Sequence, residues 1–306
     1  MRKTAIALAA FGLAAAAHAD VTIYGKLDAG FRKSIGSEDK EIATSGDSRI
    51  GFKGTEDLGN GLTAFFGMEH RFFPDTGVQD GDMFWKGYSK VGLSGAFGSV
   101  GLGRQYTAAF LMVQNKVDPF AGDTVAQVRD VAMRVGGITK VRVNNSVAYD
   151  FSTNGFKFGA TVAEAAGNGT GGTEKPTSFA GSYASGPFFI AAGLENPAGD
   201  NDRQWNLAAG YKIGAVDLTA GYADGRTNAD VKAKGYALGM NWQVGTADIK
   251  AAYGVQRVDG TTTVQKLGLG YHYNLSKRTT IYADVGHDSK ATTEKTGYDL
   301  GIRHNF

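Results

Sequence analysis

Residues 21–32 read "VTIYGKLDAGFR" and show the alternation that decides the fold. One parity of this stretch is apolar and the other is polar. The apolar set is Val21, Ile23, Leu27, Ala29 and Phe31, and the opposite set is Thr22, Tyr24, Lys26, Asp28 and Arg32. Because successive side chains of a strand point to opposite faces, the stretch predicts a β-strand with one apolar face and one polar face.

The same alternation recurs along the whole chain. It marks sixteen segments, at residues 20–32, 46–56, 62–72, 83–93, 98–107, 141–151, 156–164, 177–184, 187–196, 203–212, 215–223, 233–243, 246–256, 263–273, 278–288 and 297–306. Short turns such as "STNG" (152–155) follow the even-numbered segments, and longer loops such as 224–232 follow the odd-numbered ones. All five prolines fall in loops or at strand starts, where a missing N–H breaks no ladder bond.

These features predict an all-β fold, a sixteen-stranded antiparallel transmembrane β-barrel. An even number of alternating strands, with short turns at one end and long loops at the other, is typical of such barrels. A soluble β-sandwich also alternates, but it does not need so systematic an alternation of loop lengths. Seven aromatic side chains on the apolar parity would then form girdles at the barrel ends or pack between subunits: Phe66, Trp85, Trp205, Tyr222, Trp242, Tyr253 and Tyr271.

The N-terminus and the composition indicate export. Residues 1–19 combine a basic start (Arg2, Lys3), an apolar run and a small-x-small site at Ala17–Ala19, which predicts a cleaved signal peptide before a single barrel domain at 20–306. The apolar run is too short for a membrane helix. Removal of Arg2 and Lys3 leaves 30 basic residues against 30 acidic ones, so no basic surface points to nucleic acid. The chain has no cysteine and cannot rely on disulfides.

Four stretches together resemble the general porins of Gram-negative bacteria, particularly those of the neisserial type. They are "DVTIYGKLDAGF" (20–31), "SRIGFKGTEDLGNGLTAFFGMEH" (48–70), "YSKVGLSGAFGSVGLGRQYT" (88–107) and "RVNNSVAYD" (142–150), and the chain ends on a terminal phenylalanine strand, "GYDLGIRHNF". The resemblance implies a sixteen-stranded barrel embedded in outer-membrane lipid and assembled as a homotrimer. It also implies one aqueous pore per subunit for passive diffusion of ions and small hydrophilic solutes, narrowed by the third long loop.

Residues 108–140 lack the strand rhythm and include "NKVDPFAGDTVAQ" (115–127). This longest insert follows the fifth strand, so the resemblance makes it the loop that folds into the lumen. The turn departs from the family pattern because no Glu follows Pro119. Asp118 and Asp123 are therefore predicted to carry the negative side of the constriction. Alternatively, Asp118 caps a short helix that starts near Pro119.

The resemblance places a basic wall opposite this loop, formed by Lys26, Arg49, Arg104 and Arg142. Lys26 could instead pair with Asp28. Strict alternation turns Arg104 toward lipid, and a bulge near Gly103 would re-aim it inward.

Four further basic residues are candidates for additional pore lining: Arg71, Lys86, Arg129 and Arg134. Arg71 could form a structural lumen pair with Glu69. Arg129 and Arg134 lie in the insert and could either fix it to the wall or reach the pore.

Four basic wall residues against two loop carboxylates favour anion passage. No G-x-S-x-G or H-E-x-x-H motif is present, so an enzyme is not favoured, and no catalytic residue, metal or cofactor is predicted. Two alternatives stay open. One is an adhesive or structural barrel without a pore, and the other is a substrate-specific channel. The inward residues Tyr24, Phe65, Tyr88 and Tyr282 are too scattered to argue for such a channel.

Overall fold

The computed structural model describes residues 20–168 and 174–306, and the predicted signal peptide at 1–19 lies outside them. The described chain is built mainly from strands. They are β1 (Asp20–Lys33), β2 (Lys40–Ala43), β3 (Arg49–Gly59), β4 (Leu62–Arg71), β5 (Tyr88–Gly95), β6 (Gly98–Tyr106), β7 (Arg142–Thr153), β8 (Phe156–Ala163), β9 (Thr177–Ser185), β10 (Phe188–Asn196), β11 (Arg203–Ile213), β12 (Val216–Arg226), β13 (Lys232–Val244), β14 (Ala247–Val258), β15 (Thr261–Asn274), β16 (Thr279–Asp288) and β17 (Thr296–Asn305).

Four short helical pieces lie between β6 and β7. They are α1 (Ala108–Met112), η1 (Gln114–Lys116), α2 (Arg129–Ala132) and η2 (Val135–Gly137). Among the described residues, no helix is both long and apolar enough to cross a membrane.

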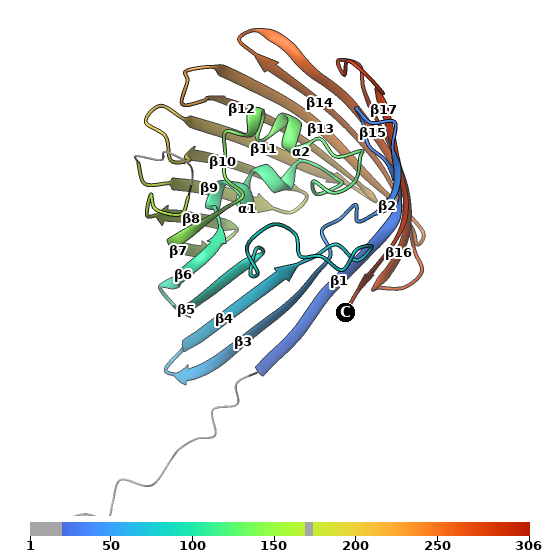
Figure 1. The fold of residues 1–306 in the computed structure, drawn as a ribbon. Helices are drawn as coiled ribbons and strands as arrows, with labels where there is room; N and C mark the ends of the chain where they lie inside the picture. The colour runs from blue at the N-terminus through green and yellow to red at the C-terminus, as the bar shows by residue number, and fades with distance from the viewer. Residues whose placement is uncertain (1–19, 169–173) are drawn as a thin grey trace, which may run out of the picture.

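The strands close into a ring (Figure 1). From β3 onward each strand pairs antiparallel with the next, and β17 pairs with β1 over a register that runs from Lys26↔Asn305 to Lys33↔Tyr298. β2 and β3 both pair with β1, at Gly30–Lys33 and Asp20–Lys26 respectively, so they are two pieces of one barrel strand. The sixteen-stranded antiparallel barrel predicted from the alternation is therefore confirmed, and its closure rules out an open sandwich.

The alternation does not predict β2, because it marks no strand between residues 32 and 46. The second barrel strand is interrupted at "TSGDS" (44–48), which bends out of the ladder toward the insert. The carbonyl of Ser45 accepts a hydrogen bond from Thr124 N at 2.8 Å. A Cβ on Gly46 would lie 2.8 Å from Asp123 Oδ2, so only glycine allows this close approach.

The two faces of the wall have opposite character. Leu194, Leu238 and Leu300 are about 60% exposed on the outer face, at 60%, 58% and 61%. On the inner face, polar side chains such as Asp28 and Asn206 are fully buried. An apolar exterior around a polar interior is the arrangement that a barrel adopts in lipid.

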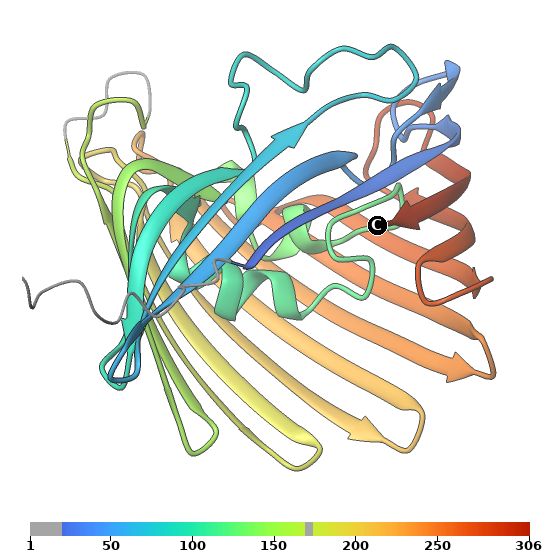
Figure 2. The same ribbon diagram turned by 90° about the horizontal axis from the view of Figure 1, so that it is seen from below.

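The segment between β6 and β7 lies within the ring in both views (Figures 1 and 2). It packs on glycines of the inner wall, where a Cβ on Gly235 would lie 1.8 Å from Ala132 O and a Cβ on Gly268 would lie 2.0 Å from Ala126 O. Its apolar side chains Val113, Val117, Val128, Ala132 and Met133 have no exposed surface. Their burial against small wall residues stabilises the docked segment.

Glu195 on β10 holds both ends of this segment. Its Oε2 accepts a hydrogen bond from Thr107 Oγ1 at 3.1 Å, and its Oε1 accepts one from Lys140 N. Glu195 is only 4% exposed, so water cannot reach the two donors to take the place of its carboxylate as acceptor.

We predict that Glu195→Ala loosens the docked segment. Each buried donor that loses its acceptor costs about 1–3 kcal/mol. Hydrogen exchange followed by mass spectrometry should show faster exchange of the amides around Lys140, while the barrel strands stay protected. Glu164→Ala is the matched control, because the Glu164 side chain is 62% exposed and pairs with Lys175 in another loop. Unchanged exchange near Lys140 would contradict the prediction.

Candidate pore constriction

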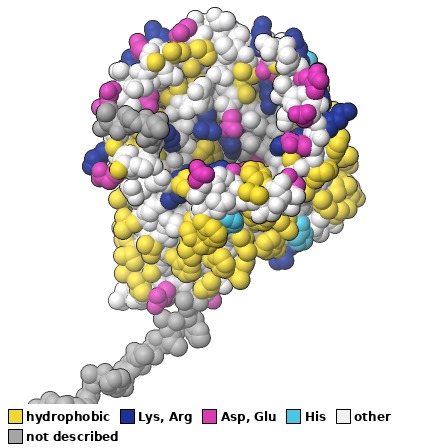
Figure 3. Space-filling view, viewed as in Figure 1, with side chains coloured by type: hydrophobic (Ala, Val, Ile, Leu, Met, Phe, Trp, Pro, Cys, Tyr) yellow, Lys and Arg dark blue, Asp and Glu magenta, His cyan; other side chains and the backbone are white. Residues whose placement is uncertain are grey.

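A charged cavity of about 500 Å³ lies between the inserted segment and the wall formed by the first strands. Lys and Arg side chains are visible in the hollow at the centre of the molecule (Figure 3). Because charged groups are costly to bury without water or partners, this cavity is an aqueous space. Its ionisable lining comprises Arg49, Arg71, Lys86, Arg129, Arg142, Asp47, Asp80 and Asp123.

Arg142 carries the least compensated charge of this lining. Its guanidinium lies 4.3 Å from the centroid of the Tyr106 ring, and its Nη2 donates to Tyr106 OH at 2.6 Å. Within residues 20–168 and 174–306, no carboxylate forms an ion pair with it. Arg142 therefore lines the cavity with a charge that no ion pair compensates, and its role at the constriction stays a prediction.

Arg49 and Arg71 are direct cross-strand partners on β3 and β4, and two carboxylates compensate their repulsion. Arg71 Nη2 lies 2.9 Å from Glu69 Oε1 and its Nη1 pairs with Asp47, so Arg71 is neutralised and nearly buried. Arg49 Nη1 lies 3.9 Å from Glu69 Oε2, a looser contact, and its side chain is 24% exposed. Of the two guanidinium groups, that of Arg49 is thus the more accessible to an ion in the cavity.

Lys26 does not face Asp123 across an open gap. Its Nζ lies 3.1 Å from Asp123 Oδ2, and Arg303 Nη2 lies 3.5 Å from the same oxygen. Arg303 in turn pairs with Asp28 at 2.8 Å. Lys26 and Asp123 thus face each other from the wall and the loop, as predicted, but in direct contact, because the loop tip docks onto β1 and β17. The role of Lys26 at the constriction stays a prediction.

Asp118 does not line the cavity, which corrects its assignment to the negative side of the pore. It is 6% exposed, and its oxygens accept hydrogen bonds from Phe120 N at 3.1 Å and Gly122 N at 2.9 Å. Val128 N and Arg129 N also donate to it, at 3.3 and 3.4 Å. Burial raises the pKa of this carboxyl. The irregular turn needs acceptors for its unpaired amides, and Asp118 supplies them.

Arg104 lies at a bulge, as the sequence indicated. The pairing of β6 with β7 shifts between Gly103 and Gln105, and Gly103 has a φ of +129°. Arg104 Nη1 donates to Asn144 Oδ1 at 2.7 Å, and its Nε and Nη2 donate to Lys86 O at 3.0 and 2.9 Å. It therefore fixes the loop before β5 and is not among the cavity lining.

The remaining predicted residues divide between lining and anchoring. Lys86 lines the cavity and pairs with Asp80 at 2.5 Å. Arg129 also lines it, and its Nη1 donates to Asn115 Oδ1 at 2.8 Å. Arg134 only fixes the segment, through Asp130 Oδ1 at 3.1 Å and the carbonyl of Thr139.

Sequence reasoning missed Asp47 and Asp80. Both lie in irregular segments, where alternation gives no face. Asp47 has a φ of +38° inside the strand interruption, and Asp80 follows β4 in a loop. The turn signals "SGDS" and "DGD" beside basic strand ends were the only indication available.

No group of three or more His, Asp or Glu side chains within the described ranges could hold a metal ion.

We predict that Asp118→Ala disorders the turn at 118–123. Four backbone N–H groups lose one shared acceptor, at a cost of about 1–3 kcal/mol for each donor left buried. Single-channel recording should show larger open-channel current noise than the wild type. Asp118→Asn keeps one carbonyl acceptor, so its current noise should lie between that of the wild type and that of Asp118→Ala. Equal noise in all three proteins would show that the carboxylate does not organise the turn.

Comparisons with known proteins agree with this architecture. A sequence profile of the Gram-negative porin family matches residues 4–293. Outer membrane porin protein 32 of Delftia acidovorans is 31% identical over the full length of both chains, and the major outer membrane protein P.IB of Neisseria meningitidis serogroup B is 26% identical over the same coverage.

Among solved structures, the anion-selective porin from Comamonas acidovorans superposes with a TM-score of 0.81 at 26% identity, covering 94% of this chain and 100% of that one. OmpT of Vibrio cholerae in a trimer form superposes at 0.75 with 15% identity, covering 94% and 99%, which supports the fold alone. The closed barrel with its charged cavity thus belongs to the Gram-negative porin family, a family of outer-membrane channels for passive diffusion.

Proposed function

We propose that this outer-membrane channel prefers anions and that the charged cavity is its constriction. Five basic side chains line the cavity against three acidic ones, and this excess carries the proposal. Asp47, Asp80 and Asp123 each pair with a basic group, so these acidic side chains offer little uncompensated negative charge to a passing ion. Arg142, without an ion pair, and Arg49, with only a loose one, remain to meet a passing ion.

A narrow aqueous passage in a low-dielectric frame strengthens the effect of such charges. At 4 Å, two unit charges interact by about 1 kcal/mol in bulk water and about 4 kcal/mol at an effective dielectric constant of 20. An anion beside Arg142 is therefore stabilised relative to a cation at the same place. The inserted segment sets the width of the passage and so limits the size of the solutes that pass. The basic wall determines whether anions or cations are preferred.

We propose a homotrimer as the assembled form. The support is the likeness to the trimeric OmpT structure, together with an outer wall that is apolar on many strands. Crosslinking of the protein in outer-membrane fragments would give a ladder that ends at three subunits.

A row of aromatic rings beside the basic wall favours a second candidate, a channel for small organic anions. The hydroxyls of Tyr24 and Tyr88 lie 2.5 Å apart, the rings of Tyr88 and Tyr106 lie 6.5 Å apart, and Tyr106 stacks on Phe110 at 5.4 Å. Tyr24 on β1 and Tyr88 on β5 are far apart in the sequence, but the fold brings their hydroxyls together. A carboxylate with an apolar body could contact both Arg142 and these rings.

We predict that removing a basic side chain and removing an acidic side chain from the cavity shift the ion selectivity in opposite directions. Arg49→Ala and Arg142→Ala should each lower the chloride-to-potassium permeability ratio by about fivefold, since each loses about 1 kcal/mol of attraction. Asp123→Asn should raise the ratio, because it releases Lys26 and Arg303. Reversal potentials in a potassium chloride gradient give the ratio for each protein.

One control separates this effect from general changes in charge. Arg278→Ala removes a charge from the short turn before β16, so it should not move the reversal potential. Arg104→Ala should have less effect than Arg142→Ala. Unchanged selectivity in both Arg49→Ala and Arg142→Ala would overturn the constriction assignment, and a bilayer without conductance steps would favour a barrel without a pore.

For the second candidate, we predict that benzoate blocks the chloride current more strongly than acetate. An aromatic contact contributes about 0.5–1.5 kcal/mol, so Tyr106→Leu should weaken the benzoate block by about two- to tenfold. Tyr273→Leu on the outer face is the matched control, because that ring is 38% exposed and outside the cavity. Equal block by the two acids in the wild type would eliminate this candidate while leaving general anion preference intact.

A further inference from the structure

Three cations form a row across the outer face of β11, β12 and β13. Arg203 is the direct cross-strand partner of Arg226, and Arg226 is the direct partner of Lys232. Like charges opposite each other on a sheet repel. Neighbouring strands are about 4.8 Å apart, so the row spans only about 10 Å.

The alternation of the strands places this row on the outside. Gln204 donates to Met133 O of the inserted segment at 2.7 Å, and Ala233 packs in the inner apolar cluster, so both point inward. Their neighbours Arg203 and Lys232 therefore point outward, and both are exposed. On β12, inward Ala223 fixes Arg226 on the outer face in the same way.

The charges of the row are poorly compensated. Arg226 Nη1 pairs with Asp230 at 3.0 Å. The side chains of Arg203 and Lys232 have no hydrogen bond or ion pair to any residue of 20–168 or 174–306. In the next row, Asp224 is already paired with Lys234 at 3.2 Å. Arg203 and Lys232 thus face outward with no counter-charge from the part of the chain that the structure describes.

An apolar and aromatic surface lies directly below the row. Trp205 packs on Tyr222 with ring centroids 5.0 Å apart, and Tyr222 packs on Tyr236 at 5.1 Å. Leu194 and Phe179 extend this surface across β10 and β9, with 60% and 50% exposure.

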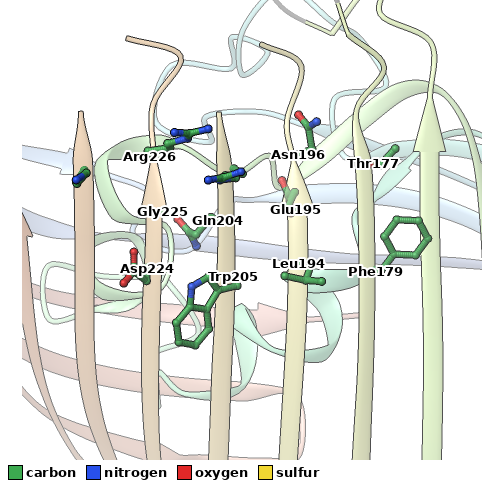
Figure 4. Close-up of a pocket in the computed structure, with 12 residues that line it drawn as sticks. Thr177, Phe179, Leu194, Glu195, Asn196, Gln204, Trp205, Asp224, Gly225 and Arg226 are labelled. Atoms are coloured by element: carbon green, nitrogen blue, oxygen red, sulfur yellow. The ribbon is translucent and has the colours of Figure 1, made fainter. Parts of the chain in front are cut away.

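One open pocket of about 740 Å³ joins the two surfaces. Its lining includes Arg203, Arg226 and Lys232 at one end and Phe179, Leu194 and Trp205 at the other. Figure 4 shows Arg226 above Asp224 on one strand, with Trp205, Leu194 and Phe179 on neighbouring strands at a lower level. The pocket is therefore amphipathic along the strand direction.

The position of the row along the barrel matches a membrane interface. β11 begins after the connection 197–202, and the connection 227–231 joins β12 to β13, whereas two-residue turns at 214–215 and 245–246 join the strands at the opposite end. In outer-membrane barrels the longer loops face the exterior, and outward charges are tolerated near the rim but not at mid-depth. The row thus lies at headgroup level above an aromatic girdle.

We propose that this pocket binds a membrane lipid with a phosphate-bearing anionic headgroup. The phosphate would lie between Arg203, Arg226 and Lys232 and relieve their mutual repulsion, since guanidinium groups bind phosphate through paired N–H donors. An acyl chain would lie along Leu194 and Trp205. The inference depends on the placement of the barrel in the outer membrane and is independent of the ion selectivity proposed for the pore.

The test uses native mass spectrometry of the full protein in neutral detergent, titrated with dilauroyl phosphatidic acid. We expect one tightly held lipid copy per chain in the wild type. Replacing both Arg203 and Lys232 by Gln should weaken binding by about tenfold or more, because each removes a hydrogen bond between charged groups. Lys212→Gln with Lys277→Gln is the matched control, since it removes two charges from the short-turn end and should leave binding unchanged.

Three outcomes would overturn the proposal. Equal weakening in the control variant would show general attraction to anionic lipid. Equal binding of glycerol phosphate would show an anion site without a lipid, and equal binding of dilauroyl phosphatidylcholine would show that the net charge of the headgroup is irrelevant.

A measurement on the wild type alone covers the case in which the double variant fails to fold. Phosphatidic acid should raise the thermal unfolding temperature of the wild-type barrel, because a ligand that binds only the folded state stabilises it. Phosphatidylcholine should not. An unfolding temperature unaffected by phosphatidic acid would also reject the site, as would a second copy of the chain that covers this face in the assembled protein.

Discussion

The ladder between β1 and β17 is the pairing on which the rest of the structure depends. Lipid offers no partners to backbone amides, so a sheet that crosses a membrane must have no open edge. The closure reaches the last residue, since Gly25 N donates to Phe306 O at 3.0 Å and Phe306 N donates to Gly25 O at 3.1 Å. Once the ring is closed, the outer face must be apolar and the inner face is free to be polar.

Closure also leaves a hollow that the wall side chains of sixteen strands cannot fill. The segment between β6 and β7 occupies one side of it, where Gly193, Gly235 and Gly268 leave room for its backbone and side chains. The other side, lined by β3, β4 and the start of β7, has arginines in place of an apolar cluster. The interior is therefore divided into a packed half and a charged, aqueous half.

The strands could be predicted from the sequence because each one obeys a simple period of two. The strand predictions fail where this alternation stops. The alternation misses β2 because the five-residue interruption at 44–48 hides its continuity with β3.

Arg49 and Arg142 project from strands and line the cavity, on the face that the alternation assigns to them. Their role at the constriction stays a prediction. Asp118 and Asp123 lie in an irregular turn, and no local pattern tells whether a carboxylate there faces water, backbone or a wall lysine. Only the docked position of the segment, set by contacts more than a hundred residues apart in the chain, decides between these. The same distance in sequence hid the aromatic row of Tyr24, Tyr88 and Tyr106.

The charge balance of the cavity follows from how the segment is held. The segment contains three acidic residues, and each has a structural partner. Asp118 accepts hydrogen bonds from the turn backbone, Asp123 pairs with Lys26 and Arg303, and Asp130 pairs with Arg129 and Arg134. Docking thus engages all three carboxylates of the segment, while no carboxylate within residues 20–168 and 174–306 forms an ion pair with the wall residue Arg142. On this view, the proposed anion preference arises from the charges that remain after the segment has been anchored. Additional carboxylates that anchor the segment would not reduce the anion preference unless one of them also paired with Arg142.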